Sequence, residues 1–129
     1  PPEVYRRLAR GKGRFRPRFP GHGKHVEADL SRQVLVLARG GRVERIYPMS
    51  SGKPSTPTVV GQFRVYMKTA GTNALGMVDS NYFVRGYAIH GYHDVPIYAA
   101  SHGCLRVPVP DAPAIYAWVR LGDRVDVYP

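Results

Sequence analysis

Short strand-like segments, separated by glycine- and proline-rich turns, recur along most of this 129-residue chain. In such segments apolar residues repeat at every second position or fill a short run, which is typical of sheets rather than helices. Many short strands and one helix predict a mainly β protein, with an antiparallel or mixed β-sandwich or a barrel-like architecture. The predicted strands cover residues 25–30, 33–39, 42–47, 62–69, 82–90 and 124–128.

The segment at 62–69 alternates most regularly and predicts one continuous strand. Between 70 and 81 the pattern loosens, and we expect a flap over a site. Loops are expected at 48–57 and 94–100, where Pro, Ser, Gly and Asp gather. In the strand at 62–69, the residues expected on one face are Phe63, Val65 and Met67, and those expected on the other are Arg64, Tyr66 and Lys68.

One clear helical pattern lies near the C-terminus, at residues 111–121. Asp111 is placed to cap the N-terminus of this helix, Pro113 suits its first turn, and Gly122 is placed to end it. The residues expected to face the core are Ile115, Trp118 and Val119.

Positive charge is concentrated at the N-terminus. Of the net charge of +10, residues 1–24 contribute +7, from eight basic residues and one acidic residue. We interpret residues 1–23 as a basic linker or the tail of an upstream module, with a short helix at 4–9, and residues 24–129 as the folded domain. A solvated linker is the simplest interpretation of this arm, but its charge also suits an anionic wall polymer or nucleic acid.

No run of the sequence approaches the roughly 18 apolar residues that a membrane span needs, and we expect no signal peptide within this stretch. The chain begins with Pro1 and not with Met, so we expect a processed piece of a longer protein. A single cysteine, Cys104, excludes an internal disulfide framework. The fold must therefore be held together by packing.

Cys104 also lies in the motif that carries most chemistry, Ser101-His102-Gly103-Cys104. A lone cysteine with histidines elsewhere in the chain is a candidate nucleophile. The thiolate is the reactive form, and a nearby imidazole that accepts the thiol proton increases its population. His90 ends a predicted strand and is free to approach Cys104 in space. We therefore favour His90 as the base and give His102 a supporting role in the cleft.

Two residues beside the cysteine suit substrate binding. Gly103 lets the backbone turn, so that the N–H groups of Gly103 and Cys104 could hold an oxyanion. Arg106 could bind a substrate carboxylate through a planar, two-pronged contact, although its spacing fits a surface arginine equally well.

A zinc site is the alternative use of the same side chains. His90, His93, His102 and Cys104 would offer three nitrogens and one sulfur, but their spacing does not match the paired ligands of structural zinc sites. We therefore expect no metal and no cofactor. The remaining histidines, His22 and His25, adjoin the linker and are expected to be solvated.

Four ordered stretches of the chain, which together cover about residues 24–129, resemble the L,D-transpeptidase catalytic domain. They are the opening hairpin at 26–35, the stretch Ser50-Ser51-Gly52-Lys53 with Thr56-Pro57 and Gly61-Gln62-Phe63, the signature Ile89-His90-Gly91-Tyr92 with Ala100-Ser101-His102-Gly103-Cys104-Leu105-Arg106-Val107, and the closing strand Leu121-Gly122-Asp123-Arg124-Val125.

The resemblance implies a sandwich-like domain that acts on peptidoglycan outside the cytoplasmic membrane, in the periplasm or cell wall. In the implied reaction, Cys104 attacks the third residue of a donor tetrapeptide stem, releases D-alanine and is left as a thioester. An amine of a neighbouring stem then forms a 3→3 cross-link, and water as the acceptor would give L,D-carboxypeptidase activity instead. Family members are typically inactivated by carbapenems, which acylate the cysteine.

The resemblance also implies roles for individual residues. His90 is the implied base and the Gly91 carbonyl orients it, while His102, Gly103 and Cys104 shape the oxyanion hole. The implied or suggested substrate-binding residues are Ser101, Arg106, Tyr82 and Tyr87.

Two features depart from the family pattern. The spacer from Gly91 to Ala100 is short, which suggests a trimmed loop on the acceptor side, and Arg106 stands where many members have asparagine. We expect a monomer whose partners are peptidoglycan stem peptides, and no nucleic acid. A non-catalytic binder of wall polymer or nucleic acid, acting through the basic arm, is the competing hypothesis.

Overall fold

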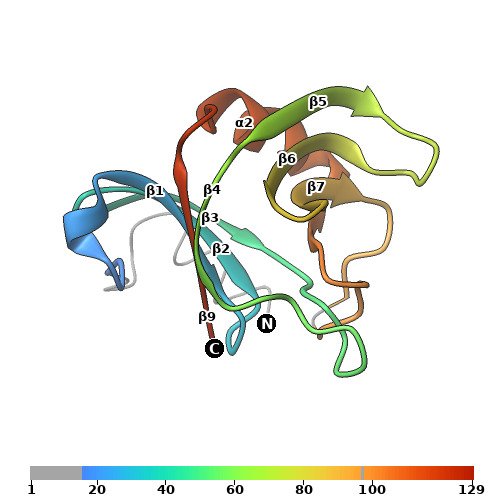
Figure 1. The fold of residues 1–129 in the computed structure, drawn as a ribbon, viewed down its shortest axis with the longest axis horizontal. Coiled ribbons are helices and arrows are strands. Elements are labelled where there is room, and N and C mark those ends of the chain that lie inside the picture. Colours follow the sequence, from blue (N-terminus) through green and yellow to red (C-terminus); the bar gives the residue numbers. More distant parts are fainter. Residues whose placement is uncertain (1–15, 97) are drawn as a thin grey trace.

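A computed structural model describes residues 16–96 and 98–129 of the chain, and in this part nine strands form two sheets (Figure 1). The five-stranded sheet has the order β3-β2-β1-β9-β4, and the four-stranded sheet has the order β5-β6-β7-β8. The predicted mainly β, sandwich-like class is confirmed. The strands are β1 (Lys24–Asp29), β2 (Val34–Arg39), β3 (Arg42–Pro48), β4 (Gly61–Arg64), β5 (Met67–Thr72), β6 (Val78–Val84), β7 (Tyr87–Tyr92), β8 (Leu105–Pro108) and β9 (Arg124–Tyr128).

Each sheet contains one parallel pair, and these pairs bring distant parts of the sequence together. β1 runs parallel to β9, near the C-terminus, and antiparallel to its hairpin partner β2. β7 runs parallel to β8 and antiparallel to β6. The second parallel pair places the chain after Cys104 directly beside the strand that carries His90.

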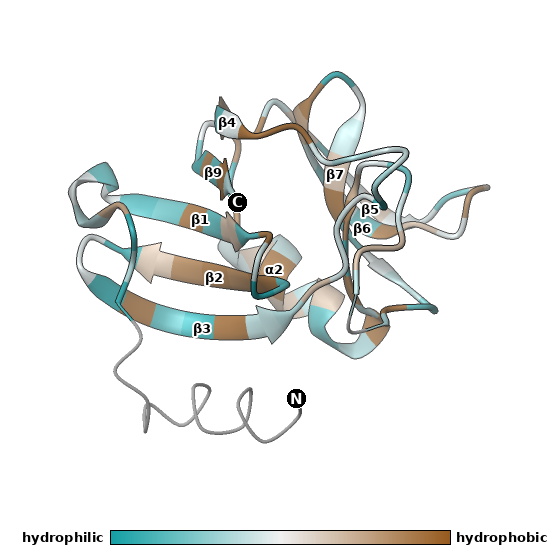
Figure 2. Ribbon diagram, turned by 90° about the horizontal axis from the view of Figure 1, so that it is seen from below, coloured by the Kyte–Doolittle hydropathy of each residue, from teal (hydrophilic) through white to brown (hydrophobic). Residues whose placement is uncertain are grey.

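The core lies between the two sheets and the helix α2 (Ala112–Trp118). Five of the six residues of β2 are buried, because apolar side chains pack on both of its faces. Figure 2 shows β2 as hydrophobic over most of its length, whereas the neighbouring β3 alternates between hydrophilic and hydrophobic residues. The main core cluster draws on most strands, with Val26, Leu35, Leu37, Phe83, Ile89, Leu105, Ile115 and Val125 among its members.

The predicted strand at 62–69 is wrong as a single element. It divides into β4 and β5, which belong to different sheets, and the chain crosses between the sheets at Val65 and Tyr66. The Val65 N–H donates to the Asp123 carbonyl in one direction, and the Tyr66 N–H donates to the Tyr82 carbonyl in the other. The alternation of faces therefore restarts at the crossing. Phe63 and Val65 pack in the core, but Met67, expected on the same face, is 43% exposed.

The predicted strand at 82–90 also divides, because a two-residue turn separates β6 from β7. Arg85 and Gly86 both have positive φ, at 41° and 81°, as two-residue hairpin turns require. The looser segment at 70–81 contains the tip of the β5–β6 hairpin. Asn73 closes this tip by accepting the N–H groups of Leu75 and Met77 at 2.9 and 3.0 Å.

The predicted helix is present but shorter. A 3-10 turn, η2 (Val109–Asp111), precedes α2, and Val119 adopts an extended conformation with ψ of 134° that ends the helix before Gly122. Asp111 occupies the N-cap position without a capping hydrogen bond from its side chain. Within the described residues, no helix has the length and apolar character needed to cross a membrane.

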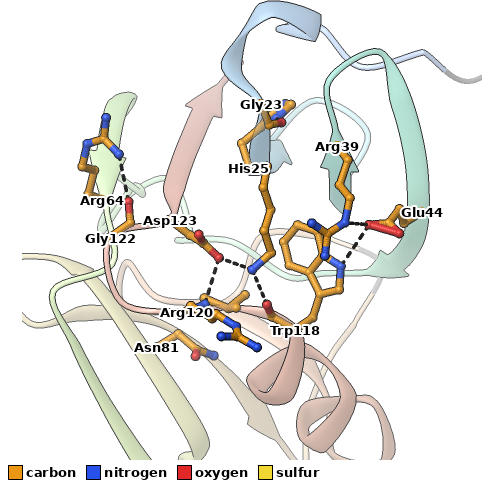
Figure 3. Close-up of polar contacts among 12 residues, drawn as sticks. Gly23, His25, Arg39, Glu44, Arg64, Asn81, Trp118, Arg120, Gly122 and Asp123 are labelled. Atoms are coloured by element: carbon orange, nitrogen blue, oxygen red, sulfur yellow. Dashed lines mark hydrogen bonds and ion pairs between the residues drawn. The ribbon is translucent and has the colours of Figure 1, made fainter.

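Two lysines occupy the C-terminal end of α2, where the last carbonyls lack partners within the helix. Lys24 donates to the Trp118 carbonyl and pairs with Asp123, both at 2.5 Å. Lys68 donates to the Tyr116 carbonyl at 2.6 Å. Figure 3 shows Asp123 and Trp118 at this end of the helix. Positive charge here also favours the negative end of the helix dipole.

The prediction that His25 is solvated is wrong. His25 is fully buried in β1, and its Nε2 lies 2.7 Å from a carboxylate oxygen of Glu27. Glu27 also accepts the backbone N–H groups of Arg18 and Phe19 at 2.8 and 2.9 Å. The side chain of His22, in the 3-10 turn η1 (Pro20–His22), contacts Asp126 at 2.9 Å. Residues 18–22 are thus packed onto β1 and β9, while the predicted helix at 4–9 and the basic residues up to Arg14 lie outside the described residues.

Candidate active site

A pocket of about 360 Å³ gathers the residues with the most reactive side chains. The parallel register of β7 and β8 pairs His90 with Arg106, so both enter the pocket from adjacent strands. The hairpin between β5 and β6 supplies a further wall, in agreement with the expected flap. The lining residues are Leu75, Met77, His90, Tyr92, Ser101, His102, Cys104 and Arg106.

Cys104 directly precedes β8 and lies beside β7. Its sulfur accepts the Ala88 N–H at 3.4 Å, and its side chain is half-buried. Burial raises the pKa of the Cys104 thiol, and it outweighs the opposing effects of the Ala88 N–H and the positive charge of Arg106. The thiol is therefore protonated at neutral pH and needs a proton acceptor to become a nucleophile.

His90 is suited to accept that proton. It is 4% exposed, and its Nδ1 lies 2.8 Å from the Gly91 carbonyl oxygen, the contact that the family resemblance implies. Because a carbonyl can only accept, Nδ1 carries the hydrogen and Nε2 keeps its lone pair. Burial and the charge of Arg106 lower the pKa of His90, although the Gly91 carbonyl opposes this. The imidazole is therefore neutral at pH 7.

The loop before β8 is held by hydrogen bonds of its own. The Ser101 hydroxyl accepts the Gly103 N–H at 3.1 Å and donates to the Cys104 carbonyl. Gly103 has a φ of 125°, and a Cβ at this position would lie 2.7 Å from the Tyr87 ring. Only glycine fits both constraints. The Gly103 N–H, predicted from the sequence as an oxyanion donor, is thus already engaged by Ser101.

A second loop, between β3 and β4, supports the first. Ser50 and Arg106 exchange two backbone hydrogen bonds at 2.9 Å, and the Lys53 N–H donates to the Ser101 carbonyl at 2.9 Å. The Thr56 hydroxyl donates to the same carbonyl at 2.8 Å, and the Thr58 hydroxyl donates to the Gly103 carbonyl at 2.9 Å. The Ser-Ser-Gly-Lys and Thr-Pro stretches therefore form a brace behind the cysteine loop.

The family model described as the L,D-transpeptidase catalytic domain matches residues 23–127. The chain belongs to this family. It is 28% identical over 126 residues to L,D-transpeptidase 1 of Mycobacterium tuberculosis, an alignment that covers 78% of this chain and 48% of that protein. The chain thus spans about half the length of this curated relative.

Solved L,D-transpeptidases share the fold. A crystal structure of the enzyme from Xylanimonas cellulosilytica superimposes with a TM-score of 0.86 at 34% identity, covering 99% of this chain and 70% of the other. A structure of the L,D-transpeptidase LdtMt1 in complex with imipenem has a TM-score of 0.69 at 24% identity, covering 82% of this chain and 59% of the other.

The site residues suggested by the L,D-transpeptidase resemblance separate into two groups. His90, His102, Cys104, Ser101 and Arg106 all line the pocket. Gly91 and Gly103 support it through the backbone contacts described above. Tyr82 and Tyr87, both within the described part of the chain, do not line the pocket. The Tyr87 ring packs against Gly103, and the ring centroids of Tyr82 and Tyr66 lie 6.4 Å apart.

Arg106 and His93 both contact a residue that sequence reasoning did not assign to the site, Tyr92. The Arg106 guanidinium lies 4.3 Å from the Tyr92 ring centroid, and the His93 ring lies 4.3 Å from it on centroids. Among the described residues, no group of three or more His, Cys, Asp or Glu side chains is placed to hold a metal ion.

Sequence reasoning also missed Leu75, Met77 and Thr58. The first two lie at the hairpin tip, where the expected flap was the only signal. Thr58 is 45 residues from its partner Gly103, and nothing in the local sequence indicates that contact.

Proposed function

We propose that this chain is the catalytic domain of a peptidoglycan L,D-transpeptidase in which Cys104 is the nucleophile and His90 the general base. One observation carries the proposal: both residues line the same pocket, and the Gly91 carbonyl holds His90 in the tautomer whose Nε2 can accept a proton. Because peptidoglycan lies outside the cytoplasmic membrane, the proposal also places the domain there.

The first half-reaction is acylation. Cys104 Sγ attacks the carbonyl carbon of the third residue of a donor stem while His90 Nε2 takes the thiol proton. The resulting oxyanion accepts a hydrogen bond from the Cys104 N–H. When the C–N bond breaks, imidazolium His90 returns the proton to the departing amine, so D-alanine leaves and a thioester remains. We assign Arg106 to the carboxylate of that D-alanine.

The second half-reaction transfers the acyl group. The side-chain amine of the third residue of an acceptor stem attacks the thioester and loses a proton to His90. The C–S bond then breaks, His90 reprotonates the sulfur, and a 3→3 amide cross-link is formed. Water in place of the amine gives a free carboxylic acid, which is the L,D-carboxypeptidase alternative.

The directions of the two pKa shifts favour proton transfer during attack over a resting ion pair. Burial raises the pKa of the Cys104 thiol, whereas burial and Arg106 lower the pKa of His90. Both shifts oppose a thiolate–imidazolium pair in the free enzyme. The thiol proton is therefore expected to leave as the sulfur attacks an electrophile.

Purified domain incubated with disaccharide-tetrapeptide fragments tests the proposal. We expect release of D-alanine and formation of a cross-linked dimer, both detected by mass spectrometry, and loss of both products in Cys104→Ala. Intact-mass measurement after mixing with imipenem should show one adduct on the wild type and none on Cys104→Ala. Absence of D-alanine release together with absence of an adduct on the wild type would refute the proposal.

A further inference from the structure

Thr58 connects the brace to the cysteine loop through a hydroxyl that is bonded on both sides. The residue is 5% exposed. Its Oγ1 accepts the Gly52 N–H at 2.8 Å and donates to the Gly103 carbonyl at 2.9 Å. A hydroxyl has a single hydrogen to donate, and the Gly52 N–H occupies its acceptor side. The hydroxyl hydrogen is thus directed at the Gly103 carbonyl.

This carbonyl belongs to the same peptide unit as the Cys104 N–H. A peptide unit is planar and trans, so its C=O and N–H point in opposite directions. Holding the Gly103 oxygen therefore fixes the direction of the Cys104 N–H. A hydrogen bond to the oxygen also polarises the amide and makes its N–H a stronger donor.

The peptide unit needs such a restraint. Gly103, with φ of 125°, has no side chain to restrict rotation of this unit. Its own N–H is held by Ser101, so the Cys104 N–H is the donor on which the proposed oxyanion stabilisation depends. Rotation of the Gly103–Cys104 peptide would turn a carbonyl oxygen toward the developing negative charge.

The conformation of the brace brings Thr58 close to the cysteine loop. A Cβ on Gly52 would lie 2.1 Å from the Thr56 carbonyl oxygen and 2.6 Å from the Thr58 nitrogen. The loop therefore closes on itself at a point that only glycine permits. This closure carries Thr58 back to the cysteine loop.

We propose that Thr58 is a positioning residue that orients the Cys104 amide as the oxyanion donor. The inference rests on the proposed function, because it requires acyl transfer to Cys104. It assigns Thr58 no contact with the substrate. Its effect is confined to steps in which a carbonyl oxygen acquires negative charge.

Two probes separate this role from general damage to the thiol. Acylation of Cys104 by p-nitrophenyl acetate passes through an oxyanion, whereas alkylation by iodoacetamide displaces iodide at a saturated carbon and forms no oxyanion. Loss of an oxyanion donor typically costs 10²–10³-fold in rate. For Thr58→Val, which keeps the shape and removes the hydroxyl, we expect the ratio of acylation to alkylation to fall about 10–100-fold. Thr58→Ser should restore the ratio to near the wild-type value.

Thr56→Val is the matched control, because it removes a hydrogen bond of the same brace to the Ser101 carbonyl, which belongs to a different peptide unit. We expect its ratio to match the wild type. Melting temperatures report the folding of each variant, and Thr58→Ala replaces Thr58→Val if the latter does not fold. A parallel fall in both rates, or a ratio unchanged by loss of the hydroxyl, would overturn the inference. D-alanine release by the wild type is scored separately, so failure of the proposed function is distinguishable.

Discussion

Two buried histidines, one on an inner strand of each sheet, have opposite electrostatic environments. His25 lies on β1 in the five-stranded sheet and His90 on β7 in the four-stranded sheet, and they are 0% and 4% exposed. Burial alone lowers the pKa of both. The pKa of His25 is nevertheless raised, because the Glu27 carboxylate and the Gly23 carbonyl outweigh burial. For His90, burial and the positive Arg106 prevail, and the pKa is lowered.

The comparison shows that the partner of the ring, and not its burial, decides its use. Next to a carboxylate, the protonated form of His25 is favoured, and the contact with Glu27 helps to anchor residues 18 and 19, whose N–H groups bond to the same carboxylate. The Nδ1 of His90 contacts the Gly91 carbonyl and no carboxylate. His90 therefore stays neutral, and its Nε2 lone pair remains available to accept a proton. The four-stranded sheet therefore carries the proposed base, and the five-stranded sheet carries a structural histidine whose protonated form is favoured.

The largest expected effect separates the two histidines by activity. His90→Gln removes the proton acceptor, so D-alanine release should fall at least about 10²–10⁴-fold, with little change in melting temperature. His25→Gln should lower the melting temperature and leave the rate per folded molecule within a few-fold of the wild type. Rates of D-alanine release and thermal denaturation, measured on the same preparations, check both expectations. Equal losses of activity in the two variants would break the comparison.

The next effect concerns stability. Glu27→Gln leaves the buried His25 without its counter-charge and weakens the acceptor for the Arg18 and Phe19 N–H groups. Breaking a buried ion pair by removing one partner typically costs about 3–5 kcal/mol, and we expect a loss near the lower end because Gln keeps an acceptor oxygen. Urea denaturation at pH 6 measures the free energy of unfolding. A loss no larger than that of His90→Gln would show that the pair contributes nothing beyond packing.

A third, smaller effect is the pH dependence of stability. The raised pKa of His25 contributes stability that is present below pH 6.5 and is lost as pH rises through its folded pKa. The lowered pKa of Glu27 contributes stability that is present above pH 4.5 and is lost as pH falls through its folded pKa. The lowered pKa of His90 acts oppositely to His25: its contribution is present above pH 6.5 and is lost on acidification.

Around pH 6.5 the two histidines therefore oppose each other, and the wild type should be flatter than either variant. His90→Gln should lose stability as pH rises above 6.5, whereas His25→Gln should lose stability as pH falls below 6.5. Melting temperatures between pH 5.5 and 8, in buffers of matched ionic strength, record the slopes. Slopes of the same sign in both variants would contradict the assigned shifts.

Features with a local sequence signal could be predicted, and features set by distant contacts could not. The pocket residues His90 and Cys104 lie in a compact motif, so their proximity could be predicted, and strand periodicity was sufficient for the fold class. The crossing at Val65 and Tyr66 could not be predicted, because alternation continues through it and only the partner strands show that the sheet has changed. The turn at Arg85 was missed because its only sequence signal is the single glycine, Gly86, that follows it.

The burial of His25 and the contact of Thr58 were missed for a different reason. In β1, His25 and Glu27 alternate with Val26 and Ala28, a pattern that normally places the polar residues in solvent. They are buried instead, and the segment at residues 18–22, whose sequence has no regular pattern, is packed onto them. Thr58 likewise acquires its role from a carbonyl 45 residues away. Contacts between distant loops have no periodic signal.

The smallest expected effect sharpens the comparison further. Asp126 lies across from Glu27 in the β1–β9 register, and its negative charge adds to the raised pKa of His25. It is 1% exposed, its Oδ2 contacts His22, and it raises the pKa of His25 through charge and not through a hydrogen bond to that ring. Asp126→Asn should therefore lower the pKa of His25 by less than Glu27→Gln does, and leave the His90 titration unchanged. Histidine ring signals followed by NMR across pH 5–9 measure both. Movement of the His90 signal would mean that the two sheets share one electrostatic network, and that the partner of each ring does not act alone.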